Sequence, residues 1–182
     1  MKKIKFLTLP ILILGLASTA FGAAHKGGEN MTSFQQVFLK QFSSESDKLV
    51  SLAEAFSEQG YAWRPAEGIR SVREAILHVA SGNYNIASRL GKAVPAGVNP
   101  RGFDKSVNTK ADTIQTLKDS IAFAKAAVME LDEAGLETEI NLFGQQSPKM
   151  AAVMVVGGHT YEHLGQLIAY ARSYGVVPPW SQ

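Results

Sequence analysis

Two histidines four residues apart are the feature of this sequence that most strongly suggests chemistry. They lie in the segment GGHTYEHLGQ, as His159 and His163. Residues four apart in an α-helix share one face and lie one turn apart, so both imidazoles can bind one ion. Of the two other histidines, His25 is close to the N-terminus, whereas His78 falls within another predicted helix. We therefore consider His78, His159 and His163 to be candidate metal ligands.

Each candidate ligand lies on or beside an apolar helix face. His78 is at the edge of one such face, and Gly82, one turn on, leaves space beside it. A single histidine in such a place is more often an ordinary core residue, but several neutral imidazoles are costly to bury without partners. A divalent cation would satisfy all three together. The face that carries His159 and His163 also carries Ala152, Val156, Leu167 and Tyr170.

The ligand type narrows the choice of metal without fixing it. Three imidazoles with an open fourth position are the arrangement of a catalytic zinc site. Nickel, copper and iron also bind imidazole, so we expect zinc or nickel, with iron and copper as alternatives. An open position could activate water or polarise the oxygen of a small-molecule substrate.

The same segment also matches H-x-x-E-H, the inverted zinc-protease signature, from His159 through Glu162 to His163. In that chemistry the glutamate is the general base, and a further acidic ligand lies downstream. No aspartate or glutamate follows Glu162 in this chain, which argues against a metalloprotease. Glu162 is kept as the candidate catalytic residue, the alternative being a surface charge.

Several other residues could support the site. Glu74 is one turn before His78 and could accept a hydrogen bond from it, although it also fits a helix cap. Gln166 follows His163 by three residues and could orient a ligand or a water molecule. The aromatic residues that could line a pocket, or equally form plain core, are Trp63, Tyr84 and Tyr170.

Four amphipathic helices are predicted to position these residues. The spacing of apolar residues predicts helices over 31–59, 72–90, 110–134 and 148–174. With no convincing sheet, this pattern predicts an all-α four-helix bundle with a long loop between the second and third helices. That loop, 91–108, is long enough to be a crossover rather than a tight hairpin. The segment 136–146 alternates weakly and could form a short extended pair or a turn.

Local signals mark the ends of these helices. Three starts carry N-terminal caps: Ser71 with Glu74, Thr109 with Asp112, and Ser147 followed by proline. The glycines that mark the four predicted ends are Gly60, Gly91, Gly135 and Gly175.

The first 22 residues have the pattern of a secretory signal peptide. Three lysines near the start precede an apolar run and then small residues. We expect cleavage after Gly22, with Ala24 as another possible site and an uncleaved anchor as the alternative. Residues 23–30 are then a flexible lead-in to one domain over 31–182. The protein would be periplasmic or secreted.

Cleavage changes the charge of the chain. The sequence has 18 Lys+Arg and 16 Asp+Glu; removing three lysines leaves 15 against 16, a net charge near −1. No basic run remains to bind nucleic acid, and no later apolar run is long enough to span a membrane. The chain has no cysteine, so it has neither disulfides nor thiolate ligands.

Three segments together resemble the DinB/YfiT-like superfamily. They are SVREAILHVASGNYN around His78, GGHTYEHLGQL around His159 and His163, and AYARSYGVVPPW near the C-terminus. The resemblance implies a four-helix bundle that holds a divalent metal through these three histidines. It also implies metal-dependent activity, often with a low-molecular-weight thiol, and in many members a homodimer. A signal peptide departs from this pattern, because an exported enzyme lacks a concentrated reduced thiol pool.

Three functions remain open at this point. The first is an exported metal-dependent hydrolase or transferase that acts on a small molecule. The second is a non-catalytic metal-binding protein, such as a periplasmic sensor or carrier. The third is a bundle in which the metal only stabilises the fold, which would require a closed fourth ligand position.

Overall fold

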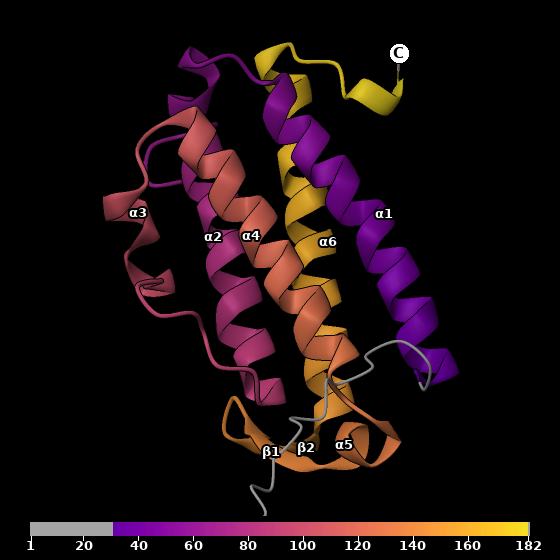
Figure 1. The fold of residues 1–182 in the computed structure, drawn as a ribbon. Helices are drawn as coiled ribbons and strands as arrows, with labels where there is room; N and C mark the ends of the chain where they lie inside the picture. Colours follow the sequence, from indigo (N-terminus) through magenta and orange to yellow (C-terminus); the bar gives the residue numbers. More distant parts are fainter. Residues whose placement is uncertain (1–30, 182) are drawn as a thin grey trace, which may run out of the picture.

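The computed structural model of the protein describes residues 31–181, and its architecture is a bundle of four long helices (Figure 1). The predicted signal peptide 1–22 and lead-in 23–30 lie outside the described residues. The four long helices are α1 (Ser33–Ala55), α2 (Val72–Ala87), α4 (Lys110–Met129) and α6 (Lys149–Tyr174). The predicted all-α four-helix bundle is therefore confirmed, with helix ends that differ by several residues.

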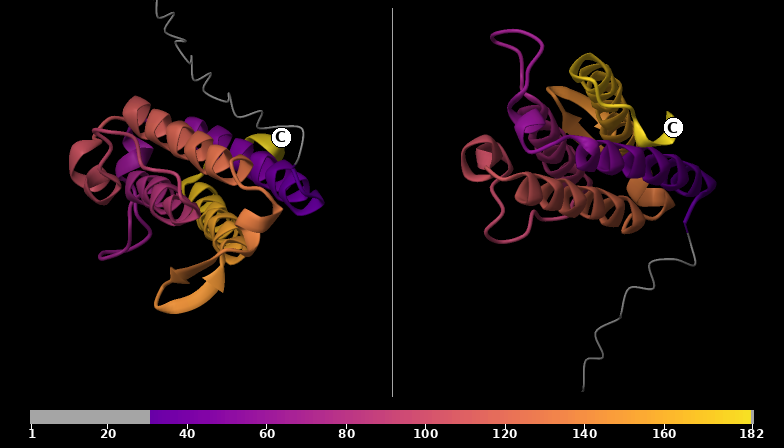
Figure 2. Two further views of the ribbon diagram at one scale, coloured as in Figure 1. Left: turned by 60° about the horizontal axis from the view of Figure 1, so that its bottom comes forward. Right: turned by 90° about the horizontal axis from the view of Figure 1, so that it is seen from above.

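Short elements connect the long helices. Two are helical, α3 (Phe103–Ser106) and α5 (Glu133–Glu137), and two are strands, β1 (Glu139–Leu142) and β2 (Gln145–Pro148). The strands form an antiparallel hairpin that projects from one end of the bundle (Figure 2). The described residues also contain four 3-10 turns: η1 (Gln59–Ala62), η2 (Ser88–Leu90), η3 (Pro100–Gly102) and η4 (Pro179–Ser181).

Contacts between helix ends show how α1, α2 and α4 run relative to one another. Near the start of α1, Gln35 Nε2 donates to the carbonyl of Val128 at the end of α4, 2.7 Å away. At the start of α4, Lys110 Nζ donates to the carbonyl of Phe56 just after α1, 2.6 Å away. These two helices are therefore antiparallel. An ion pair between Lys92 and Glu130 joins the ends of α2 and α4, so α2 and α4 are parallel.

The parallel pair explains the long loop 91–108. It must carry the chain back along the whole bundle from the end of α2 to the start of α4, and Figure 1 shows this course through α3. The predicted crossover is confirmed. Arg73 near the start of α2 holds the loop in place, because its Nη1 donates to the carbonyls of Asp104 (3.2 Å) and Val107 (2.6 Å).

A continuous apolar core holds the four helices together. Burial of apolar surface is the main favourable term in folding. On α6, the predicted apolar stripe beside the histidines is buried along its length. The largest fully buried aliphatic and aromatic side chains include Phe42, Phe56, Leu49, Leu52, Ile76, Leu117 and Leu167. None of the helices among residues 31–181 is long and apolar enough to cross a membrane.

The start of α2 is fixed by the predicted capping box. Ser71 Oγ accepts from the Glu74 N–H at 3.2 Å, and Glu74 Oε2 accepts from the Ser71 N–H at 2.7 Å. The Ser71 N–H, with the nearby Arg64 guanidinium, lowers the pKa of Glu74 below its usual range. The carboxylate is thus ionised and engaged at the cap, which places His78 in the second turn of a well-anchored helix.

Replacing Ser71 with alanine should lower the free energy of unfolding by about 1 kcal/mol, because one backbone N–H loses its acceptor. Urea denaturation measures this change. Ser44→Ala is the matched control, since Ser44 is an exposed serine within α1. Equal stability losses in the two variants would contradict a capping role for Ser71.

Two predicted helix ends are wrong. The third predicted helix was expected to continue to residue 134 and to end at Gly135. The helix α4 instead ends at Met129, because Asp132 starts a new short helix by accepting from the Gly135 N–H at 2.7 Å. Gly135 therefore lies inside α5. Likewise, the first helix ends at Ala55 rather than at residue 59, and Gly60 lies within the turn that follows.

The start of α6 also differs from its predicted cap. Ser147 does not cap the helix; it pairs with Ile140 in the β-hairpin. Pro148 occupies the N-cap position and provides no side-chain hydrogen bond. This hairpin confirms the predicted short extended pair. Ser147, which was expected to cap the helix, belongs to the hairpin instead.

Candidate metal centre

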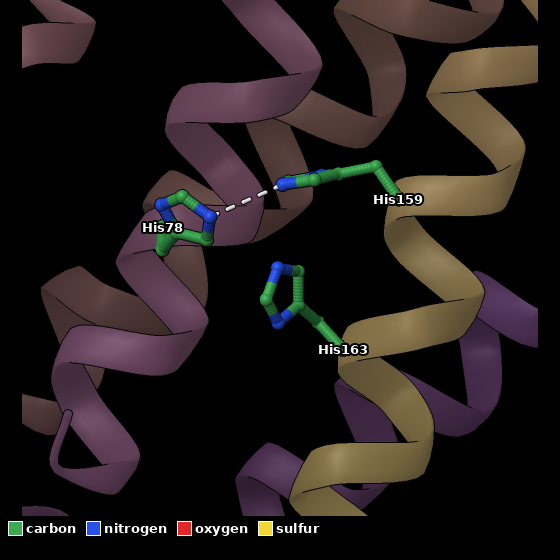
Figure 3. Close-up of side chains that lie close together, drawn as sticks. All are labelled: His78, His159 and His163. Atoms are coloured by element: carbon green, nitrogen blue, oxygen red, sulfur yellow. Dashed lines mark hydrogen bonds between the residues drawn. The ribbon is translucent and has the colours of Figure 1, made fainter. Parts of the chain in front are cut away.

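Three imidazoles from two helices meet between α2 and α6. His78 comes from α2, and His159 and His163 come from successive turns of α6 (Figure 3). Each offers a ring nitrogen, and these nitrogens lie within 4.8 Å of one another. The sequence placed all three on inward faces, and the structure brings them together. They lie close enough to hold one metal ion.

The spacing of two of these nitrogens suits a shared ion. His159 Nε2 lies 3.2 Å from His78 Nε2. Two nitrogens bound about 2.1 Å from one tetrahedral ion are separated by roughly 3.4 Å. The observed distance also allows a hydrogen bond between the two neutral rings, so the pair is compatible with either state.

Of the three histidines, His159 is the one with an unsatisfied buried hydrogen-bonding group. Its Nδ1 is buried and has no hydrogen-bond partner among the described residues. Burial, together with the neighbouring His163 and His78 and the charge of Arg70, lowers the pKa of His159 to about 4. The ring is therefore neutral at neutral pH, which is the form that binds a metal.

The backbone of Gly82 creates the space for His159. A Cβ atom at Gly82 would lie 2.2 Å from Cε1 and 2.6 Å from Nδ1 of His159. The sequence indicated space near His78 at this position, and the structure shows that His159 fills it. Gly157, on α6, allows a second close approach, because a Cβ there would lie 2.9 Å from Cε2 of Phe38 on α1.

His163 is oriented by its own helix. Its Nδ1 lies 2.7 Å from Gln166 Oε1, and Gln166 Nε2 donates to the Tyr170 hydroxyl at 2.9 Å. An amide oxygen can only accept, so Nδ1 carries a proton, and in the neutral form of the ring Nε2 keeps a free lone pair. This is the outer support that metal-binding histidines usually have. Trp63 packs edge-on against Tyr170, with ring centroids 5.6 Å apart.

His78 connects the cluster to the surface. It lines a cleft of about 450 Å³ between the start of α2 and the crossover segment that contains η3 and α3. Burial, followed by the charge of Arg70 and then His163, lowers the pKa of His78, while Glu162 acts in the opposite direction. A small molecule in this cleft could therefore reach one of the three imidazoles.

The other predicted site residues have different outcomes. Glu162 is exposed and near enough to influence His78 electrostatically, but it makes no hydrogen bond to a histidine within residues 31–181. Its catalytic role stays a prediction. Glu74 is occupied by the helix cap. Tyr84 packs against Phe103 and Phe123 in the core, with ring centroids 5.9 and 4.9 Å apart.

Sequence reasoning missed the arginines of the cleft. Arg64 and Arg70 precede α2, and Arg101 lies in the crossover. Arg70 lies one residue before the Ser71 cap of α2 and outside the helix, so its closeness in sequence to His78 was the available signal. Arg101 had no such signal, because only the course of the loop brings it to the same cleft.

The fold and the cluster together define a helical-bundle protein with a three-histidine candidate metal centre. The chain belongs to the DinB family, whose pattern matches residues 31–182. The uncharacterized protein YjoA of Bacillus subtilis is 27% identical over 142 residues, covering 75% of this chain and 88% of YjoA. The crystal structure of YjoA has a TM-score of 0.63 and 26% identity, and covers 80% of this chain and 97% of its own.

More distant structures share the fold. A DinB-like protein from Bacillus cereus has a TM-score of 0.70 at 16% identity, covering 79% of this chain and 95% of its own. A mutant of the mycothiol-dependent maleylpyruvate isomerase has a TM-score of 0.59 at 16% identity. That match covers 75% of this chain and 63% of the isomerase. At these identities the likeness concerns the fold alone.

Proposed function

We propose that this protein is an exported metal-dependent hydrolase or transferase that acts on a small molecule. The observation that carries the proposal is the placement of three imidazoles around one point, with one of them lining an open cleft. A purely structural metal site would be closed by a fourth protein ligand. Among the described residues, the cluster contains only the three histidines.

The three histidines suit a divalent ion that prefers imidazole ligands. The donor set is three imidazole nitrogens, the His78–His159 spacing suits a shared ion, and Gln166 accepts from Nδ1 of His163. When bound, the ion would lower the pKa of a water molecule or polarise a substrate oxygen. We propose zinc or nickel, with iron or copper as alternatives.

The protein's own residues would have the following roles in the reaction. His78, His159 and His163 would hold the ion, and Gln166, by accepting from Nδ1 of His163, would leave Nε2 of that ring as the ligand atom. Glu162 is our proposed base, since it is the carboxylate on α6 beside the histidines. The cleft next to His78 would hold the substrate.

A thiol cosubstrate has limited support. The maleylpyruvate isomerase with the related fold is named as mycothiol-dependent, but export would place this protein outside the reduced thiol pool.

If residues 1–22 are removed, the purified protein from the native host should begin at Ala23. Intact mass measurement checks this: a chain that retains Met1 in the membrane fraction would contradict cleavage, and one that retains Met1 in the cytoplasmic fraction would contradict export. The homodimer likewise stays a prediction.

Elemental analysis of the purified protein, made without a histidine tag, tests the proposal. We expect about one transition metal per chain, and loss of that metal in His78→Ala and in His159→Ala. His25→Ala is the matched control, because it removes the remaining histidine of the chain. Absence of metal from the wild type after incubation with zinc or nickel would refute the proposal. Metal retained by His78→Ala alone would show that the ligand on α2 is wrongly assigned.

A further inference from the structure

The cleft beside His78 has a charged lining that the three histidines do not explain. Three arginines contribute to it, Arg64, Arg70 and Arg101, together with two carboxylates, Glu74 and Asp104. The arginines come from two separate segments, the turn before α2 and the crossover. Basic side chains gathered around a small cleft attract anions, and the low-dielectric wall increases their effect.

One of the three arginines is already occupied. Arg64 Nη1 donates to the carbonyl of Ile69 at 2.7 Å, and Arg64 Nη2 forms an ion pair with Glu74 Oε2 at 3.2 Å. Glu74 in turn belongs to the cap of α2. The Arg64–Glu74 pair is therefore neutral as a unit and has a structural role.

Arg70 and Arg101 are not occupied in this way. Within residues 31–181, neither guanidinium has an ion pair or a hydrogen bond to another residue, and both are exposed in the cleft. Asp104 supplies the one remaining carboxylate of the lining, and it has no ion pair there either. Two unpaired positive groups against one negative group leave the cleft with a positive charge.

The charge of Arg70 also extends over the histidine cluster. It is among the causes that lower the pKa of both His78 and His159. A divalent ion held by three neutral imidazoles would keep its full charge of 2+. Both the arginines and the occupied metal centre would therefore attract the same anion.

The wall that carries Arg101 is held in a defined position. Arg73 binds the backbone of the crossover at Asp104 and Val107, and Phe103 is buried beneath it against Tyr84. A cleft with fixed walls loses less entropy when a ligand binds. The arginines are thus presented by anchored backbone, although their side chains reach into solvent.

We propose that Arg70 and Arg101 bind an oxyanion group, a carboxylate or a phosphate, of a small substrate whose other end reaches the metal held by His78, His159 and His163. The planar guanidinium forms paired hydrogen bonds with either group. This inference rests on the proposed function, because it assigns the substrate class of that same site. It assigns specificity to Arg70 and Arg101, neither of which holds the ion.

Calorimetric titration of the zinc-loaded full chain at low ionic strength tests the inference. The probes are succinate, methyl phosphate and succinamide, the last being the neutral counterpart of succinate. We expect at least one of the two anions to bind, and succinamide to bind about tenfold more weakly or not at all. Whichever anion binds more tightly shows which of the two groups the cleft prefers.

Variants then locate the binding site. Arg70→Gln and Arg101→Gln should each weaken anion binding about tenfold, while the zinc content stays at the wild-type level. Arg89→Gln is the matched control, since Arg89 is an exposed arginine in η2 outside the cleft. Equal weakening in all three variants would overturn the inference by showing a general charge effect. Equal binding of succinamide and succinate would also overturn it.

The titration separates this inference from the proposed function. Zinc bound at one per chain without Arg70-dependent anion binding refutes the inference and leaves the metal site intact. Arg70-dependent anion binding to a protein that takes up neither zinc nor nickel supports the anion site and refutes the metal-dependent function.

Discussion

Replacing Gly82 with alanine is expected to weaken metal binding by more than about a hundredfold, while the bundle stays folded. The added Cβ would lie 2.2 Å from Cε1 of His159, far inside the normal contact distance of two carbon atoms, roughly 3.5 Å. The new Cβ is fixed by the backbone of α2, whereas the His159 ring can turn about its side-chain bonds, so the ring must move from its place beside His78. Loss of one of three ligands should cost more than loss of an outer hydrogen-bond partner, which alone costs about 10–100-fold.

Gly158→Ala is a matched control for this experiment. Gly158 is also within a helix and one residue from His159, but a Cβ there meets nothing within 4 Å. It should keep full metal binding and gain up to about 1 kcal/mol of stability from the higher helix propensity of alanine. Zinc affinity by competition with a chromophoric chelator, and circular dichroism for folding, measure both variants. Unchanged affinity in Gly82→Ala would show that His159 is not a ligand.

The metal-free protein is expected to lose about 3 kcal/mol of unfolding free energy as the pH falls from 6.5 to 4. The pKa of His159 is about 4 in the folded protein and 6.5 when the ring is fully solvated. In this pH window the unfolded chain therefore binds a proton that the folded protein does not bind. The contribution of His159 to the free energy of unfolding is fully present above pH 6.5 and is lost as the pH falls towards 4. The lowered pKa of His78 acts in the same direction.

Urea unfolding with a chelator present, at pH 7 and at pH 4.5, measures this loss. The control variant is His159→Gln, which keeps a polar side chain and cannot titrate. Its stability should change less between the two pH values, whereas acid effects from groups such as Glu74 are common to both proteins and cancel in the comparison. Identical pH dependence in the two proteins would show that His159 is not protonated on unfolding.

The histidine centre could be predicted because its signals are local. The i, i+4 spacing places His159 and His163 on one face, and the apolar stripe on α6 shows that this face is buried. Ser71 and Thr109 cap their helices as the sequence predicts, because a cap depends on residues three positions apart. The crossover followed from the length of the loop 91–108.

The remaining features depend on tertiary contacts. Gly82 was associated with His78 on its own helix, and only the docking of α6 shows that the space belongs to His159. Arg101 reaches the cleft because Arg73 holds the crossover against α2. The end of α4 was misplaced for a different reason: Asp132 can start a helix as well as follow one, and the apolar periodicity continues across both.

If His78, His159 and His163 hold one ion, their separation along the chain would make the stability of the fold depend on the supply of that metal. His78 and His159 are 81 residues apart, so one ion can join them only after α2 and α6 have docked. In the unfolded chain only His159 and His163 are near neighbours, and closing the longer loop costs entropy. The ion should therefore bind the folded state far more tightly. At a free concentration 100 times its dissociation constant it would add about 2.7 kcal/mol to stability. When the metal is scarce, the protein should therefore be less stable, accumulate more slowly and be degraded faster, whether or not substrate is present.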